Sequence, residues 1–361
     1  MALSPADVSF LVEHATQAPS GGNVQPWNWV YQDKTLLLFN DVNRSASVLN
    51  YNSTGSLLTF GASIENLVLA STKNKWFADI TYFPLGTDNQ LMASIVFSPL
   101  EETTTQHPYP NLIDSVFQRG TNRTLGKRTE IADQKYSELS NIVSTVEGAQ
   151  LKIFSSDSEL DSFKSVLGEI DKLFMTNQTG HAHFTKEIRW SQKEAEETRD
   201  GVDINTIDLT PTERAGLILA RNWNVTKHIK KWKLGNEFGK LSQKAVDAAS
   251  CLGMITMPSR SPINYINGGR AVERLWLAAT AKGIALQPMS ISTFLFARID
   301  DDNFEGIEEI RDGIVGEYNK VRQLADLQEN EKDVFFFRLS LAPKPDVLAL
   351  RRKLEDVLVV K

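Results

Sequence analysis

The chain has 361 residues, of which 41% are hydrophobic and 23% charged, so its composition is that of a globular protein and excludes a disordered or fibrous one. Its formal net charge of −6 argues against nucleic-acid binding as the main activity. Cys251 is the single cysteine, which excludes an intramolecular disulfide and a cysteine-cluster zinc site and predicts a reduced, cytoplasmic compartment.

The first half of the chain begins with a predicted helix over residues 5–17, for which Ser4 and Asp7 are capping partners. Asp7 and Glu13 also stand where a signal peptide needs a basic start, and no apolar run approaches about 18 residues, so no membrane partner is expected. Residues 29–31 and 35–40 are predicted to form a hairpin around residues 32–34, and further strands are predicted at residues 80–83 and 91–97. A segment rich in Glu, Thr, Pro and His, over residues 101–110, marks the boundary with the second half.

The loop after the first helix, residues 18–27 (APSGGNVQPW), is the strongest functional signal. Its two prolines fix their own φ angles and its two glycines permit backbone angles that other residues avoid. Ser20, Asn23 and Gln25 can therefore converge on one ligand, and their donors and acceptors suit the edge of a flat heteroaromatic group. The alternative is an ordinary loop after a helix C-terminus.

A second candidate site lies at residues 119–123 (RGTNR), which follow a short predicted helix over residues 111–118. Arg119 and Arg123 flank the hydroxyl of Thr121, and two guanidiniums with a neutral donor between them can share one phosphate. A solvated basic loop is the alternative, because basic loops of this length are common on protein surfaces.

Two distant segments share one pattern: residues 61–70 read GASIENLVLA and residues 269–278 read GRAVERLWLA. In each, a glycine opens a predicted helix with apolar residues three and four apart, and a Glu follows four places later. The pattern indicates one helix used twice, and two unrelated amphipathic helices are the alternative.

The second half contains a long polar insertion, residues 181–240, that has no counterpart in the first half. Residues 191–200 and 210–220 look helical, and the insertion is predicted to be a lid, a partner surface or a helical hairpin packed on the side. His181 and His183 have the spacing of a metal pair but lack partners, so no metal site is expected. Strands are predicted at residues 284–289 and 334–340.

The loop at residues 18–27 resembles the segment Ala-Pro-Ser-x-x-Asn-x-Gln-Pro-Trp of the FMN-dependent nitroreductase family, and residues 119–123 are similar to the family's Arg-x-Ser/Thr-x-Arg/Lys element. The resemblance implies that FMN is the cofactor, with Arg119 and Thr121 at its phosphate and Arg123 at the pyrimidine side of the ring. It further implies contacts to the flavin from Ser20, Asn23 and Gln25, a phosphate ligand at Arg338, and ring neighbours at Pro288, Met289 and Ser290.

The same resemblance implies the fold: an α+β chain with two nitroreductase-like lobes, each an antiparallel-rich sheet flanked by helices. The lobes are expected at residues 1–105 and 106–361, with the insertion in the second. In the family one subunit supplies the Arg-rich element and its partner the Ser/Asn/Gln turn, and here each half carries only one of the two. We therefore expect a tandem pseudo-dimer with one FMN. Some similar tandem proteins are fused to an E1/ThiF-like adenylyltransferase domain.

Two functions follow from these expectations. The first is an oxidoreductase that uses NAD(P)H to reduce a small aromatic or quinone-like acceptor through FMN, with no catalytic acid or base required for hydride transfer. The second is a flavin-holding or regulatory protein whose insertion seals the ring, associated with an adenylyltransferase partner. Fold membership alone does not choose between them.

Overall fold

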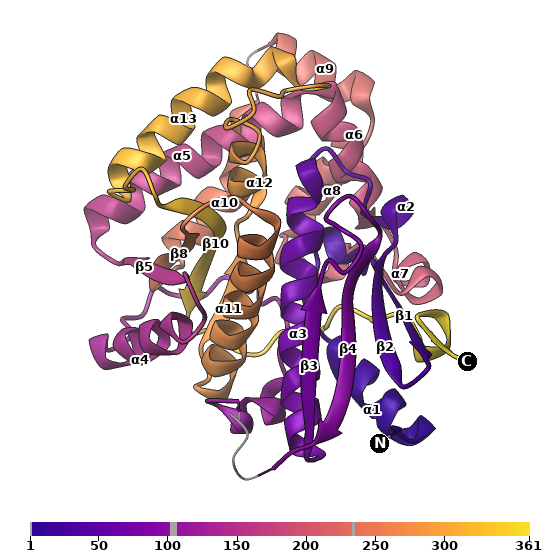
Figure 1. The fold of residues 1–361 in the computed structure, drawn as a ribbon. Coiled ribbons are helices and arrows are strands. Elements are labelled where there is room, and N and C mark those ends of the chain that lie inside the picture. The colour runs from indigo at the N-terminus through magenta and orange to yellow at the C-terminus, as the bar shows by residue number, and fades with distance from the viewer. Residues whose placement is uncertain (1, 102–106, 233–234) are drawn as a thin grey trace.

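The computed structural model describes residues 2–101, 107–232 and 235–361, and shows a mixed α+β architecture in which helices flank two main sheets (Figure 1). The first sheet has the strand order β11-β1-β2-β4-β3, and only β11 runs parallel to its neighbour. The second sheet is antiparallel, in the order β5-β8-β10-β9. The strands are β1 (Trp27–Gln32), β2 (Thr35–Asn40), β3 (Trp76–Tyr82), β4 (Leu91–Pro99), β5 (Gln150–Phe154), β8 (Cys251–Met257), β9 (Ala285–Pro288), β10 (Lys332–Ser340) and β11 (Leu358–Val360).

Two long helices, α3 (Thr54–Lys73) and α11 (Pro262–Ala281), lie side by side at the centre of the molecule between the two sheets (Figure 1). Both are buried on most of their circumference, as expected of helices inside a core rather than on a surface. Trp29 of the first sheet, Phe60 of α3 and Trp276 of α11 belong to one continuous hydrophobic cluster. The predicted halves of the chain therefore share a core.

The helices α3 and α11 approach most closely at two glycines. A Cβ atom added to Gly61 would lie 2.0 Å from the carbonyl oxygen of Ile266, and one added to Gly269 would lie 2.0 Å from that of Leu58. The two contacts are reciprocal. The spacing in the sequence between Gly61 and Gly269 equals that between Leu58 and Ile266, so each glycine meets the same position on the opposite helix. A reciprocal contact of this kind is what a two-fold axis produces between identical surfaces.

The prediction that these glycines open their helices was wrong. Helix α3 begins seven residues before Gly61, at Thr54, and α11 begins at Pro262, with Ser261 as its N-cap. The Ser-Pro pair before α11 is an ordinary helix start signal, whereas α3 has no side-chain cap. The glycines lie inside the helices because only a residue without a side chain permits the backbones to meet there.

Other predicted elements are confirmed with small shifts at their ends. Helix α1 spans Pro5–Ala15, and Ser4 and Asp7 form the expected reciprocal capping box. The hairpin and strands β4, β9 and β10 occur where they were predicted, whereas β3 begins at Trp76, four residues before the predicted start at residue 80. Residues 111–118 were predicted to be a helix but form a short 3-10 helix, Pro110–Ser115. The predicted boundary between residues 105 and 106 falls within residues 102–106, which lie outside the described residues.

The C-terminal segment crosses from one sheet to the other. After β10 the chain leaves the second sheet, and β11 pairs in parallel with β1 of the first, with Trp29 opposite Leu358. This crossing, which the sequence did not predict, draws residues 348–352 along the loop at residues 18–27. The edge of the first sheet is thereby covered by residues from the far end of the chain.

The insertion is helical. Its helices are α6 (Gln178–Glu187), α7 (Gln192–Thr198), α8 (Pro211–Ala220), α9 (Trp223–Lys231) and α10 (Asn236–Asp247), with short parallel strands β6 (Ile188–Arg189) and β7 (Val202–Asp203). The remaining helices are α2 (Val42–Ser45), α4 (Asp133–Ser144), α5 (Asp157–Thr176), α12 (Ile291–Phe296) and α13 (Arg311–Leu324). The insertion helices α6, α9 and α10 pack on α5. Within the described residues His181 is buried against the carbonyl oxygen of Ala220, and no cluster of three metal-ligating side chains occurs. No described helix is long and apolar enough to cross a membrane.

Candidate functional site

One cavity of about 330 Å³ lies where both halves of the chain, the insertion and the C-terminal segment meet. Its volume falls within the range of small-molecule sites. Seven of the ten residues predicted to form the site line this cavity, namely Ser20, Asn23, Arg119, Thr121, Arg123, Pro288 and Ser290. The other three, Gln25, Met289 and Arg338, do not. The loop after α1 and the Arg-rich segment therefore face one space although about a hundred residues separate them.

The loop after α1 is held in an unusual backbone conformation. Gly22, Asn23 and Gln25 have φ angles of 55°, 53° and 51°, in the left-handed region that non-glycine residues seldom occupy. The hydroxyl of Ser20 accepts a hydrogen bond from the backbone N–H of Gln25, 3.0 Å away, and so closes the loop. Such a conformation persists only where surrounding contacts hold it, and in this chain those contacts come from two other segments.

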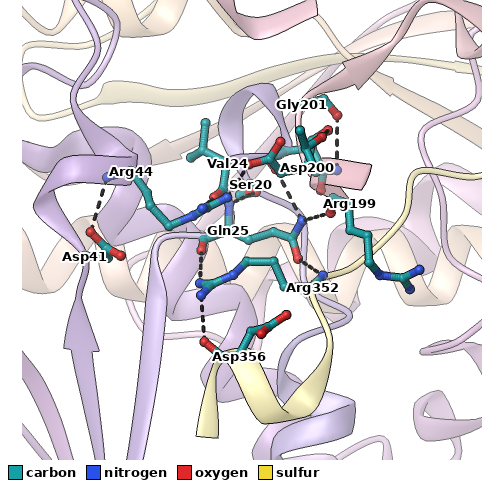
Figure 2. A network of polar contacts seen from close by, with 12 residues as sticks. Ser20, Val24, Gln25, Asp41, Arg44, Arg199, Asp200, Gly201, Arg352 and Asp356 are labelled. Atoms are coloured by element: carbon teal, nitrogen blue, oxygen red, sulfur yellow. Dashed lines mark hydrogen bonds and ion pairs between the residues drawn. The ribbon is translucent and has the colours of Figure 1, made fainter. Parts of the chain in front are cut away.

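Two side chains of the loop, those of Gln25 and Asn23, supply those contacts, and Figure 2 shows the contacts of Gln25. The side-chain amide nitrogen of Gln25 donates to the carbonyl oxygen of Arg199, 2.8 Å away, and its oxygen accepts from the backbone N–H of Arg352 at 2.7 Å. Asn23 likewise donates to the carbonyl oxygens of Gly201 and Leu350, both at 3.1 Å. Gln25 is fully buried, so the expectation that it meets a ligand is replaced by a role in binding the insertion and the C-terminal segment to the loop.

An ion-pair network fixes the insertion against the first half. Asp200 pairs with Arg44, and it also pairs with Arg189 of β6. The Nε atom of Arg44 in addition donates to the carbonyl oxygen of Val24, 2.9 Å away (Figure 2). The two arginines hold the pKa of Asp200 below its usual range, although burial alone would raise it. Asp200 is therefore ionised at neutral pH and the network is intact.

Arg119 lies at the cavity wall with incomplete charge compensation. Its guanidinium stacks on Trp276, with 4.5 Å between the guanidinium carbon and the ring centroid, and donates to the carbonyl oxygen of Gln17 at 2.7 Å. The nearest carboxylate belongs to Glu273, 3.3 Å from Nε, but burial raises the pKa of Glu273 to about 7. Glu273 is thus only partly ionised at neutral pH, and Nε of Arg119 makes no hydrogen bond among the described residues.

Arg351 is a site residue that sequence reasoning missed. It lines the cavity, donates to the side-chain oxygen of Asn23 at 3.0 Å and to the carbonyl oxygen of Gln17 at 3.1 Å, and its buried Nε has no partner among the described residues. Burial, followed by the positive charge of Arg119, lowers the pKa of Arg351 to about 9. Two guanidiniums of like charge therefore lie close together at the cavity wall, an arrangement that an anionic ligand would stabilise.

Arg123 adds a third positive charge. Its guanidinium donates to the hydroxyl of Thr206 in the insertion, 3.1 Å away, and no carboxylate within the described ranges pairs with it. Burial lowers the pKa of Arg123 to about 10, so it stays protonated at neutral pH. Among the described residues, the cavity wall thus carries three arginines and a single acidic side chain, that of Glu187. Aromatic and apolar side chains form much of the rest of the wall, namely Leu58, Phe117, Val272, Trp276, Phe294 and Phe335.

Of the four site residues predicted near the end of the second half, two line the cavity and two do not. Pro288 and Ser290 line the cavity, whereas Met289 is buried and its backbone N–H is engaged with the carbonyl oxygen of Phe336 at 2.7 Å. The fully buried guanidinium of Arg338 is occupied by Gln287, Ala245 and Thr124, at distances of 2.7 to 3.1 Å. The prediction of Arg338 as a phosphate ligand fails on this geometry, because its donors serve the protein.

Comparisons with known proteins give partial likenesses. No protein-family model matches the chain. It is 25% identical over 348 residues to an uncharacterized protein of Mycobacterium tuberculosis (strain CDC 1551 / Oshkosh), a match that covers 95% of this chain but only 47% of that relative, so the chain spans about half of the relative's length. It is 24% identical over 293 residues to the "Putative NAD(P)H nitroreductase acg" of the same species, covering 81% of this chain and 82% of that one.

Among solved structures, the FMN-dependent nitroreductase NfnB from Mycobacterium smegmatis in complex with NADPH matches 68% of this chain and 96% of its own. The sequence identity is 15% and the TM-score 0.38, values too low to establish a shared fold.

Proposed function

We propose that this chain is an FMN-dependent oxidoreductase that uses NAD(P)H, with the cofactor in the cavity between its halves. The observation that carries the proposal is that three arginines without full counter-ions, the buried Arg119 and the half-buried Arg123 and Arg351, meet aromatic side chains in one cavity. A flat aromatic group that ends in a phosphate suits both features. The phosphate would balance the positive charge of the arginines, and the ring would pack against the apolar part of the cavity wall.

The residues at the wall divide by their chemistry. Arg119, Thr121 and Arg351 are proposed to hold the phosphate, with Arg351 in the place that the sequence assigned to Arg338. Arg123 is proposed at the pyrimidine side of the ring, with Ser20 and Asn23 as neutral neighbours. Bound FMN supplies two-electron transfer from NAD(P)H to an acceptor. The fixed charge of Arg123 would stabilise the negative charge that reduction adds.

The proposal includes a tandem origin for the site, with lobes at residues 1–105 and 106–361 that act as the two subunits of a dimer. Two observations support this. The reciprocal contacts at Gly61 and Gly269 have the form of a two-fold interface. The two sets of wall residues also come from different halves: Ser20 and Asn23 from the first, and Arg119 and Arg123 from the second.

The relative named as a nitroreductase adds support from sequence, because its match extends over most of both chains. A small aromatic or quinone-like molecule is the acceptor that we propose. The apolar side chains at the wall, Phe117, Phe294 and Phe335 among them, give such an acceptor a surface on which to stack.

A second candidate function is a flavin-holding or regulatory protein with little turnover. One observation favours it: the insertion and the C-terminal segment are both fastened to the loop at residues 18–27, through Gln25 and Asn23, beside the cavity. Segments so held restrict access to a ligand inside. An adenylyltransferase partner remains a prediction from the sequence resemblance.

Reduction of the bound flavin distinguishes the two functions. We expect NADH or NADPH to bleach the yellow absorbance of the purified protein anaerobically, and added menadione to restore it. A flavin that dithionite reduces but neither nicotinamide reduces would contradict the oxidoreductase and favour the holding protein.

A further inference from the structure

Glu187, the last residue of α6, is the one acidic side chain among the residues that line the cavity. It packs directly over the loop at residues 18–27, since a Cβ atom added to Gly22 would lie 2.7 Å from the Glu187 carboxyl carbon. The carboxyl group thus reaches the cavity from the insertion, which no sequence motif singled out.

The nearby guanidinium of Arg189 donates to the backbone carbonyl oxygen of Glu187, 3.4 Å away, and forms its ion pair with Asp200, so no ion pair with the Glu187 carboxyl occurs among the described residues. Lys186 and Arg189 are the neighbouring cations, and Arg189 is engaged with Asp200, 2.5 Å away. Burial outweighs the attraction of both cations and raises the pKa of Glu187 to about 7. A substantial fraction of the group is therefore protonated at neutral pH, next to a space that we assign to cofactor and substrate.

Across the cavity the charged groups are Arg119, Arg123 and Arg351, which hold their protons at neutral pH. No His, Cys, Tyr or Lys side chain lines the cavity in the described part of the chain. Glu187 is thus the side chain at this wall that can release a proton near neutral pH.

We propose that Glu187 is the catalytic acid that protonates the acceptor during its reduction, an inference that rests on the proposed oxidoreductase function. A quinone-like acceptor takes up one hydride, which carries two electrons, and one proton to become the hydroquinone. The O–H bond of Glu187 breaks, a new O–H bond forms on the acceptor oxygen, and water returns a proton to the carboxylate. No acid was expected from the sequence, because hydride transfer alone needs none.

The test uses the flavin-loaded protein, with Glu187→Gln as the variant and Glu197→Gln, an exposed glutamate of the same insertion, as the matched control. Reoxidation of the reduced flavin by menadione is followed by stopped flow against pH. For the unchanged protein we expect the rate to be highest when Glu187 is protonated and to fall as pH rises through about 7. Glu187→Gln is expected to reoxidise about 10²-fold more slowly at pH 6 and to lose this pH dependence.

Two further readouts separate a proton donor from a merely structural residue. Flavin content, and flavin reduction by dithionite, are expected to be the same in Glu187→Gln, Glu197→Gln and the unchanged protein. Several carboxyl groups, Glu273 among them, are partly protonated near pH 7, so the infrared carbonyl band is compared between variants without acceptor. We expect the component that titrates near the Glu187 pKa of about 7 to be missing from the difference spectrum of Glu187→Gln and retained in Glu197→Gln.

The outcomes are distinct. If Glu187→Gln reoxidises at the unchanged rate with the same pH profile, Glu187 is not the acid, while the oxidoreductase function stands. If the unchanged protein retains no flavin, or its flavin is not reduced by NADH or NADPH, both proposals fall.

Discussion

Replacement of Gln25 by Ala is expected to lower the free energy of unfolding by about 2–4 kcal/mol, because it leaves the N–H of Arg352 and the carbonyl oxygen of Arg199 without partners. Urea unfolding measures this loss. Gln32→Ala is the matched control, since Gln32 is exposed at the end of β1, and its effect is expected within about 0.5 kcal/mol.

The same variant tests whether Gln25 fastens the two covering segments. Limited proteolysis is expected to cut near residues 199–203 and 348–352 faster in Gln25→Ala than in the unchanged protein. Because Gln25 has a positive φ that Ala tolerates poorly, Gln25→Asn serves as a second variant that accepts this backbone but is too short to reach both segments. Unchanged unfolding and cleavage in both variants would show that the side chain has no such role.

Replacement of Arg351 by Gln is expected to weaken FMN binding by about 1.5–3 kcal/mol, or roughly 10- to 100-fold in Kd, the scale of a hydrogen bond to a charged group. The affinity for riboflavin, which lacks the phosphate, is expected to fall much less in the same variant. Fluorescence titration of the protein stripped of flavin, with each ligand in turn, gives both values.

Arg352→Gln is the matched control for this experiment. Arg352 does not line the cavity, and its guanidinium donates to the carbonyl oxygen of Asp356 at 2.7 Å (Figure 2). If Arg351→Gln weakened the binding of FMN and of riboflavin equally, Arg351 would act only by positioning Asn23, to which it donates a hydrogen bond. Unchanged FMN binding would remove Arg351 from the phosphate site.

The sequence predicted those parts of the site that are local in the chain. Residues 18–27 and 119–123 are short motifs whose own composition predicts ligand binding, and the structure brings both to one cavity. Arg351 and Glu187 reach the cavity only because the C-terminal segment crosses between sheets and the insertion folds back, and neither path has a local signal. Arg351 stood in a basic run, which usually indicates a solvated surface.

The direction in which a side chain points was the second feature that could not be predicted from the sequence. Gln25 and Arg338 stand in or near the expected motifs, yet both are fully buried, and their polar atoms are satisfied by the protein. A motif fixes a backbone position, whereas the partner of a side chain depends on what packs over it. The same reasoning applies to Gly61, where the helix continued through the glycine because α11 crosses there.

The ratio of flavin to polypeptide, from the absorbance of FMN released by denaturing the purified protein after saturation with FMN, tests the central claim most directly. We expect one FMN per chain, since residues from both halves are needed to build the one cavity that the three arginines line. A protein that binds none at saturation, or that binds two, would contradict a single site shared between the halves.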